Sequence, residues 1–84
     1  MNSRQKRTLE SLFTEPAKPN IAWADIESLF LAAGCRIIEG SGSRVRFEFR
    51  GVIATFHRPH PAKEAKRYQV RDAREYLRKL GIQQ

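Results

Sequence analysis

Residues 44–57 read RVRFEFRGVIATFH, and this stretch decides the fold. Polar and apolar residues alternate without a break from Arg44 to Arg50, which is the pattern of a strand with one buried face. Gly51 suits a tight turn because glycine adopts positive φ without strain, and a second β-prone run, 52–57, follows it. The stretch therefore predicts a β-hairpin with Arg50 and Gly51 as its turn residues.

The same pattern predicts the register of the hairpin. With a two-residue turn at these positions, two residues face each other across the hairpin when their numbers sum to 101. The apolar pairs then share one face: Phe49 with Val52, Phe47 with Ala54, and Val45 with Phe56. The other face pairs Arg44 with His57, Arg46 with Thr55, and Glu48 with Ile53. A slip of one residue would bury arginines, so we expect two arginines and a histidine on the solvent face.

Two amphipathic segments flank the three predicted strands. Apolar residues recur at helical spacing in residues 20–34, which Asn20 opens, and from about Tyr68 to Gly81. The run 35–39 is β-prone, and a loop at 40–43 separates it from the hairpin. We predict an α+β domain in the order α-β-β-β-α, with a three-stranded antiparallel sheet and both helices on its apolar face. Double-stranded-RNA-binding domains share this order.

Residues 1–19 are predicted to form an N-terminal helical extension. Ser3 can serve as the N-cap of a short helix, and Pro16 and Pro19 end it because proline cannot continue a helix. The prediction thus divides the chain into a helix and linker, residues 1–19, and one domain, residues 20–84.

The composition limits the class of protein. With 84 residues the chain makes one domain, and an enzyme that encloses a large cofactor would not fit. No apolar run approaches the ~18 residues that a membrane span needs, and none resembles a signal peptide. A single cysteine, Cys35, can form neither an internal disulfide nor a zinc cluster. We expect a reduced, cytoplasmic protein that uses no cofactor.

The excess positive charge lies entirely in the second half of the chain. Residues 1–43 hold five bases and five acids, whereas residues 44–84 hold eleven bases and four acids, which accounts for the net charge of +7. A basic footprint of this kind suits a polyanion, because displaced counterions drive binding to phosphates. The alternative is a charged surface that only keeps the protein in solution.

One histidine stands among the predicted surface arginines. His57 and His60 have no second pair of ligands, so we expect no metal site. Cleavage of RNA needs a base for the 2′-hydroxyl proton, a cation beside the phosphate and an acid for the leaving oxygen, and histidine suits acid–base work near neutral pH. His57 with Arg44 and Ser43 would supply the catalytic groups. The residues expected to hold RNA are Arg46, Arg58, His60, Lys63, Arg71 and Arg74. The alternative is that His57 is an ordinary strand-end residue or only contacts phosphate.

Four segments, in chain order, resemble the HicA toxin family. They are the helix WADIESLFLAAG at 23–34, the turn GSGS at 40–43 with the basic strand after it, FHRPHP at 56–61, and REYLRKLGI at 74–82. The resemblance covers about residues 20–82. It implies a double-stranded-RNA-binding-domain-like fold and a small bacterial toxin that cleaves messenger RNA and is neutralised by a HicB antitoxin.

The sequence departs from the family pattern at one position. HicA toxins usually carry their catalytic histidine just after the Gly-Ser turn, where this chain has Ser43 and Arg44. The predicted register puts His57 opposite Arg44, so we expect His57 to take that place as the acid/base, and the antitoxin to cover the solvent face of the sheet. One alternative is a non-catalytic RNA-binding module of the same fold. Another is DNA binding through a helix-turn-helix, which the hairpin directly after the first domain helix disfavours.

Overall fold

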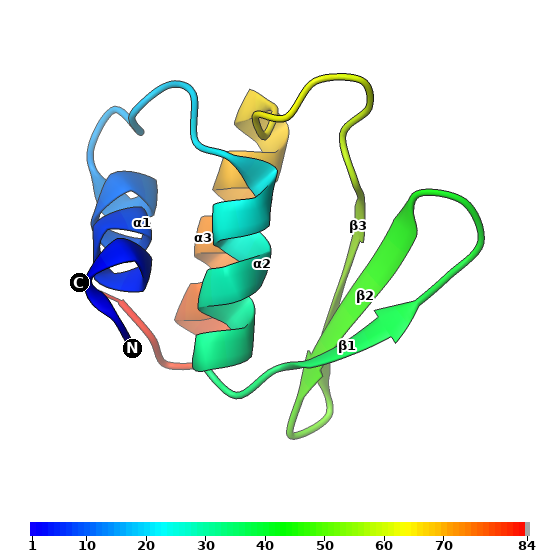
Figure 1. The fold of residues 1–84 in the computed structure, drawn as a ribbon. Coiled ribbons are helices and arrows are strands. Elements are labelled where there is room, and N and C mark those ends of the chain that lie inside the picture. Colours follow the sequence, from blue (N-terminus) through cyan, green and yellow to red (C-terminus); the bar gives the residue numbers. More distant parts are fainter. Residues whose placement is uncertain (84) are drawn as a thin grey trace.

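The computed structural model describes residues 1–83 and confirms the predicted α+β architecture (Figure 1). The elements run in the order α1, α2, β1, β2, β3 and α3. Their bounds are Ser3–Phe13 for α1, Trp23–Ala32 for α2, Arg36–Glu39 for β1, Arg44–Phe49 for β2, Val52–His57 for β3 and Arg67–Lys79 for α3. None of the helices in this range is long and apolar enough to cross a membrane.

The hairpin register is the predicted one. In the antiparallel sheet, of order β1-β2-β3, the register pairs Arg44 with His57 and Phe47 with Ala54. Arg50 and Gly51 have φ values of 50° and 84°, as the central residues of a type I′ turn require. This turn follows the right-handed twist of the strands, so the local backbone and the apolar pattern specify the same register.

The molecule has a helical layer on one side of the sheet only. Figure 1 shows α2 and α3 beside the sheet and α1 on their far side, which leaves the second face of the sheet without a covering helix. Phe47 is fully buried beneath α2, where the centroid of its ring lies 4.8 Å from that of Phe30. The ring of Phe56 lies 5.2 Å from that of Trp23. Aromatic packing between the hairpin and α2 therefore forms the centre of the core.

The N-terminal helix packs against α2 and α3. Leu12 is fully buried within the same apolar cluster as the domain helices. The amide of Gln5 donates to the hydroxyl of Ser28 at 3.0 Å, and Arg4 pairs with Asp25 at 2.9 Å. The division into residues 1–19 and 20–84 stays a prediction, whereas the contacts show that the extension shares the core.

The predicted N-cap of α1 and the predicted start of α2 are wrong, whereas the predicted start of α3, at about Tyr68, is confirmed to within one residue. The N-cap of α1 is Asn2 rather than Ser3, because the Asn2 side chain accepts from the backbone N–H of Gln5 in a capping box. Helix α2 begins at Trp23 rather than Asn20, since Asn20 has a φ of 61° and Ala22 is extended. Helix α3 begins at Arg67, one residue before the predicted start.

Replacing residues on the two faces of β2 tests the register. We predict that Phe47→Ala lowers the free energy of unfolding by about 3–5 kcal/mol, because it empties a fully buried site. The neighbouring Arg46→Ala, on the exposed face, should change it by less than about 0.5 kcal/mol. Urea unfolding measures both values, and Phe47→Leu gives a smaller loss if the alanine variant does not fold. Equal losses at positions 46 and 47 would contradict the register.

Candidate active site on the open sheet face

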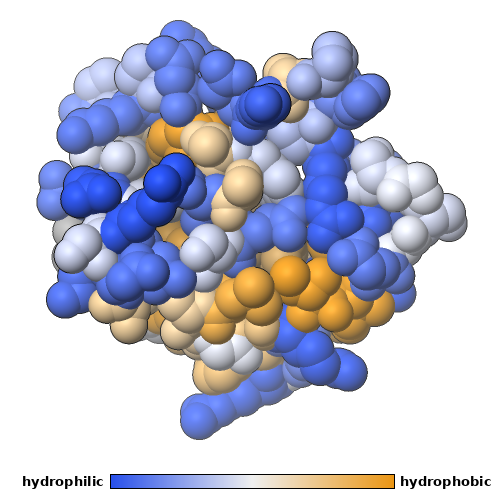
Figure 2. Space-filling model, in the orientation of Figure 1, coloured by the Kyte–Doolittle hydropathy of each residue, from blue (hydrophilic) through white to orange (hydrophobic). Residues whose placement is uncertain are grey.

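Two arginines and a histidine lie on the open face of the sheet. Arg44 stands opposite His57 on the neighbouring strand, and Arg46 stands opposite Thr55. All four side chains are exposed. Figure 2 shows that hydrophilic residues cover much of the visible surface, with an apolar band in the region of β1. The register alone brings these side chains together, since each β-strand turns alternate residues to the same face.

Ser43, Arg44 and His57 form the predicted catalytic group, and the structure brings them together. The Oγ atom of Ser43 lies 3.5 Å from Nδ1 of His57. The backbone carbonyl of Ser43 accepts from the N–H of Arg58 at 2.9 Å, which holds the loop before β2 against the end of β3. The imidazole therefore lies next to a hydroxyl, on a residue that pairs with Arg44 across the strands, and it stays open to solvent.

Glu48, a carboxylate on this face, lies at the other end of β2 from Arg44. Glu48 accepts from the N–H of Gly51 at 2.7 Å and from Arg36 Nε at 3.2 Å. These two bonds, the first more than the second, hold the pKa of Glu48 below its ordinary value. Because this carboxylate is already engaged beside the turn, it leaves the charge of Arg44 available at the other end of the strand.

A buried amide fixes the backbone of the histidine. Gln69, on α3, is 1% exposed, and its Nε2 donates to the carbonyl of His57 at 2.7 Å. Its Oε1 accepts from the N–H of Lys66 at 2.9 Å, so both ends of the amide are used. Gln69 could not be predicted from the sequence, because a single glutamine in a basic helix carries no signal of burial. Without Gln69, the carbonyl of His57 would lose this hydrogen bond while it remains partly buried, which costs free energy.

Arg58 lies on the helical side of the sheet rather than on the open face. Its guanidinium contacts Glu27 on α2 at 2.7 Å and Glu39 on β1 at 2.7 Å. The hydrogen bonds with Glu39 and then Glu27 raise the pKa of Arg58, and the guanidinium lowers the pKa of Glu39. The indole N–H of Trp23 also donates to Glu27. The structure thus ties the end of β3 to α2 and β1 through Arg58, whose predicted contact with RNA stays a prediction.

The remaining predicted RNA-binding residues lie at two other places. His60 and Lys63 are exposed in the segment between β3 and α3. Arg71 and Arg74 lie on α3, in the helical layer, where Arg71 is exposed and Arg74 pairs with Glu15 at 2.8 Å. The structure does not bring these two arginines onto the face that carries His57, because α3 packs against the apolar side of the sheet.

Cys35 is not suited to act as a nucleophile. Cys35 is buried, with Sγ 3.7 Å from the hydroxyl of Tyr76, and burial raises the pKa of its thiol. A raised pKa keeps the thiol protonated, which is the opposite of what a cysteine nucleophile needs. Within residues 1–83, no group of three or more histidine, cysteine or acidic side chains could hold a metal ion.

The fold and the open face define a small α+β protein with the element order of a double-stranded-RNA-binding domain and an exposed imidazole on the same sheet face as Arg44 and Arg46. Residues 23–82 match the family model described as "HicA toxin of bacterial toxin-antitoxin". The chain therefore belongs to the HicA toxin family, which implies an antitoxin as its partner. Comparisons with the curated proteins and with the solved structures found no match.

Removing the guanidinium of Arg58 should raise the pKa of Glu39. The folded-state pKa of Glu39 is lowered, so the pair stabilises the fold above the unfolded Glu pKa of about 4.3 and loses that contribution as the pH falls through the lowered value. We predict that Arg58→Met returns the pKa of Glu39 toward its ordinary value in an NMR titration. Between about pH 5 and pH 3, the variant should also lose less stability than the unmodified protein.

Glu48 is the internal control for that titration. Its pKa is lowered by Gly51 and Arg36, neither of which contacts Arg58, so it should be the same in both proteins. An unchanged pKa at Glu39 in Arg58→Met would contradict the ion pair.

Proposed function

We propose that this toxin is an endoribonuclease that cleaves messenger RNA without a metal ion, using His57 as its acid/base, and that a HicB antitoxin neutralises it. The observation that carries the proposal is the placement of His57 beside Ser43 and opposite Arg44 on an exposed sheet face. Together these groups supply a proton acceptor and a positive charge where a phosphodiester can reach them.

The reaction follows from the chemistry of the RNA backbone. Nδ1–H of His57 donates to Ser43 Oγ in the tautomer that leaves the Nε2 lone pair free to accept the 2′-hydroxyl proton. The 2′-oxygen attacks phosphorus, and the bond from phosphorus to the 5′-oxygen of the next nucleotide breaks. The leaving oxygen takes a proton from the imidazolium, so the protons balance, and a 2′,3′-cyclic phosphate results. Arg44 offsets the negative charge that builds up on the phosphate oxygens.

The surrounding residues have different roles in this proposal. Arg46 extends the cationic face along β2, and His60 and Lys63 hold the RNA from the segment after β3. Arg58 and Gln69 position the end of β3 and so orient His57. A longer RNA would also reach Arg71 and Arg74 along the flank of α3. This assignment is supported by exposure for all the contact residues except Arg74, which is part-buried, and by the hydrogen bonds of Arg58 and Gln69 for the positioning residues.

The open face also suits the antitoxin. Ile53 is 53% exposed on the same face as Arg44 and His57. A partner could therefore place an apolar group on Ile53 and an acidic group against Arg44. A partner seated on this face would exclude RNA from His57. That makes steric and electrostatic occlusion the proposed means of neutralisation.

A single substitution at His57 tests the catalytic assignment. We predict that the unmodified protein cuts a long RNA in the presence of EDTA, and that His57→Ala slows the cut by at least about 10²-fold, because general acid–base catalysis contributes roughly 10²–10⁴-fold. RNA affinity should change little, since the arginines remain. Thr55→Ala, an exposed change on the same face, is the matched control and should keep its cleavage rate.

The outcomes separate the two candidate functions. Undiminished cleavage by His57→Ala would overturn the assignment of the base. If neither protein cuts RNA while both bind it, the chain is a non-catalytic RNA-binding module.

A further inference from the structure

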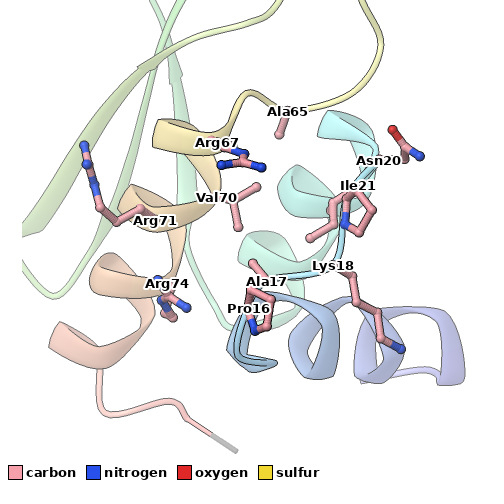
Figure 3. Close-up of a pocket in the computed structure, with 11 residues that line it drawn as sticks. Pro16, Ala17, Lys18, Asn20, Ile21, Ala65, Arg67, Val70, Arg71 and Arg74 are labelled. Atoms are coloured by element: carbon pink, nitrogen blue, oxygen red, sulfur yellow. The ribbon is translucent and has the colours of Figure 1, made fainter.

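A pocket of about 510 Å³ opens in the helical layer, away from the open sheet face. One wall is the linker between α1 and α2, residues 16–21, and the other is the segment 65–74 with the first half of α3 (Figure 3). Its size is within the range of about 300–1,000 Å³ that is typical of ligand pockets. The proposed cleavage chemistry and the expected antitoxin contact both lie on the sheet, away from this pocket, although Arg71 and Arg74 at its edge are also proposed to contact a longer RNA.

The pocket has an aliphatic floor and a cationic rim. The apolar lining residues are Pro16, Ala17, Pro19, Ile21, Ala65 and Val70, and the basic ones are Lys18, Arg67, Arg71 and Arg74. Figure 3 shows the side chain of Arg67 extending from α3 over the pocket, with Val70 below it and Ile21 on the facing wall. The described lining residues include neither an acid nor an aromatic side chain.

The positive charge of the rim is only partly compensated. Arg74 pairs with Glu15, and its buried Nε has no hydrogen-bond partner in residues 1–83. Lys18 and Arg67 are exposed, and no carboxylate of the described residues lies within ion-pair distance of either. Arg71 pairs with Asp72 at 3.5 Å, so the uncompensated charge of the rim is that of Lys18 and Arg67. The ligand that best complements this pocket has negative charge for the rim and aliphatic groups for the floor.

These two requirements favour a peptide over RNA. Single-stranded RNA is held by stacking its bases on aromatic rings, and the pocket offers none. Phosphates alone would pair with the rim but would leave the floor uncovered. A peptide with carboxylates beside a leucine or valine side chain would pair with the rim and also cover the floor. The toxin family implies an antitoxin protein as a partner that could supply such a peptide.

We propose that this pocket binds an acidic segment of the antitoxin, which places an aliphatic side chain on the floor and carboxylates against Lys18 and Arg67. The proposal rests on the partner that the toxin family implies and is independent of RNA cleavage. Residues 16–21 lie outside the family match at 23–82, so one wall belongs to the part of the chain that the family does not specify. The pocket would thus let the toxin distinguish its own antitoxin from those of other family members.

The test is a calorimetric titration of the full chain with its purified antitoxin. We predict that the double variant Lys18→Glu/Arg67→Glu binds about tenfold more weakly, because two favourable charge contacts become repulsive. Ala17→Phe, which fills the pocket without a change of charge, should weaken binding by at least about fivefold. The control is Lys6→Glu/Lys79→Glu, which makes the same change of net charge at exposed positions outside the pocket and should stay within about twofold.

RNA binding and cleavage are measured on the same variants. The proposal requires that Ala17→Phe keeps its RNA affinity and its cleavage rate, and that Lys18→Glu/Arg67→Glu loses no more of either than the control variant with the same net charge. It is overturned if the pocket variants bind the antitoxin as the control does, or if they lose affinity for RNA while they keep it for the antitoxin. If the unmodified protein does not cut RNA, the proposed catalysis is contradicted but the pocket proposal is not, since the titration with the antitoxin does not depend on cleavage.

Discussion

The pairing of β2 with β3 is the constraint on which the rest of the structure depends. Val45 and Phe47 face Phe56 and Ala54 across the hairpin, and these apolar side chains form the surface that α2 and α3 cover. A strand has only two faces, so burying this set commits the alternate residues to solvent. The cationic face with its single histidine is therefore a direct consequence of the core, and any change of register would remove both at once.

The end of β3 is held firmly while the side chain of His57 stays free. Gln69 binds the carbonyl of His57, Ser43 binds the N–H of the next residue, and Arg58 is held between Glu27 and Glu39. These contacts fix the backbone that carries the imidazole without burying the ring. A catalytic group that must contact a large, charged substrate needs both a fixed position and exposure. The helical layer has a separate basic surface around the pocket of Lys18 and Arg67, so one small chain offers two faces of different chemistry.

The sequence was sufficient to predict the element order, the hairpin register and the face that carries Arg44, Arg46 and His57, because alternation and turn residues act locally. It could not reveal the contacts that depend on three-dimensional packing. Arg58 looks like another surface cation in the chain, and only the approach of α2 and β1 gives it two carboxylates. Gln69 and the pocket beside α3 escaped prediction for the same reason. The start of α2 was missed because Asn20 has a positive φ and Ala22 is extended and paired with Glu64, a partner far along the chain.

The chemistry of the cleaved ends tests the central claim most directly. If His57 activates a 2′-hydroxyl on the open sheet face, a defined RNA cut by the purified protein in EDTA must end in a 2′,3′-cyclic phosphate. A 2′-deoxy substitution at the cleaved nucleotide must abolish that cut. Mass spectrometry of the products distinguishes the outcomes. A 3′-hydroxyl end, or cleavage that persists at the deoxy position, would contradict the account.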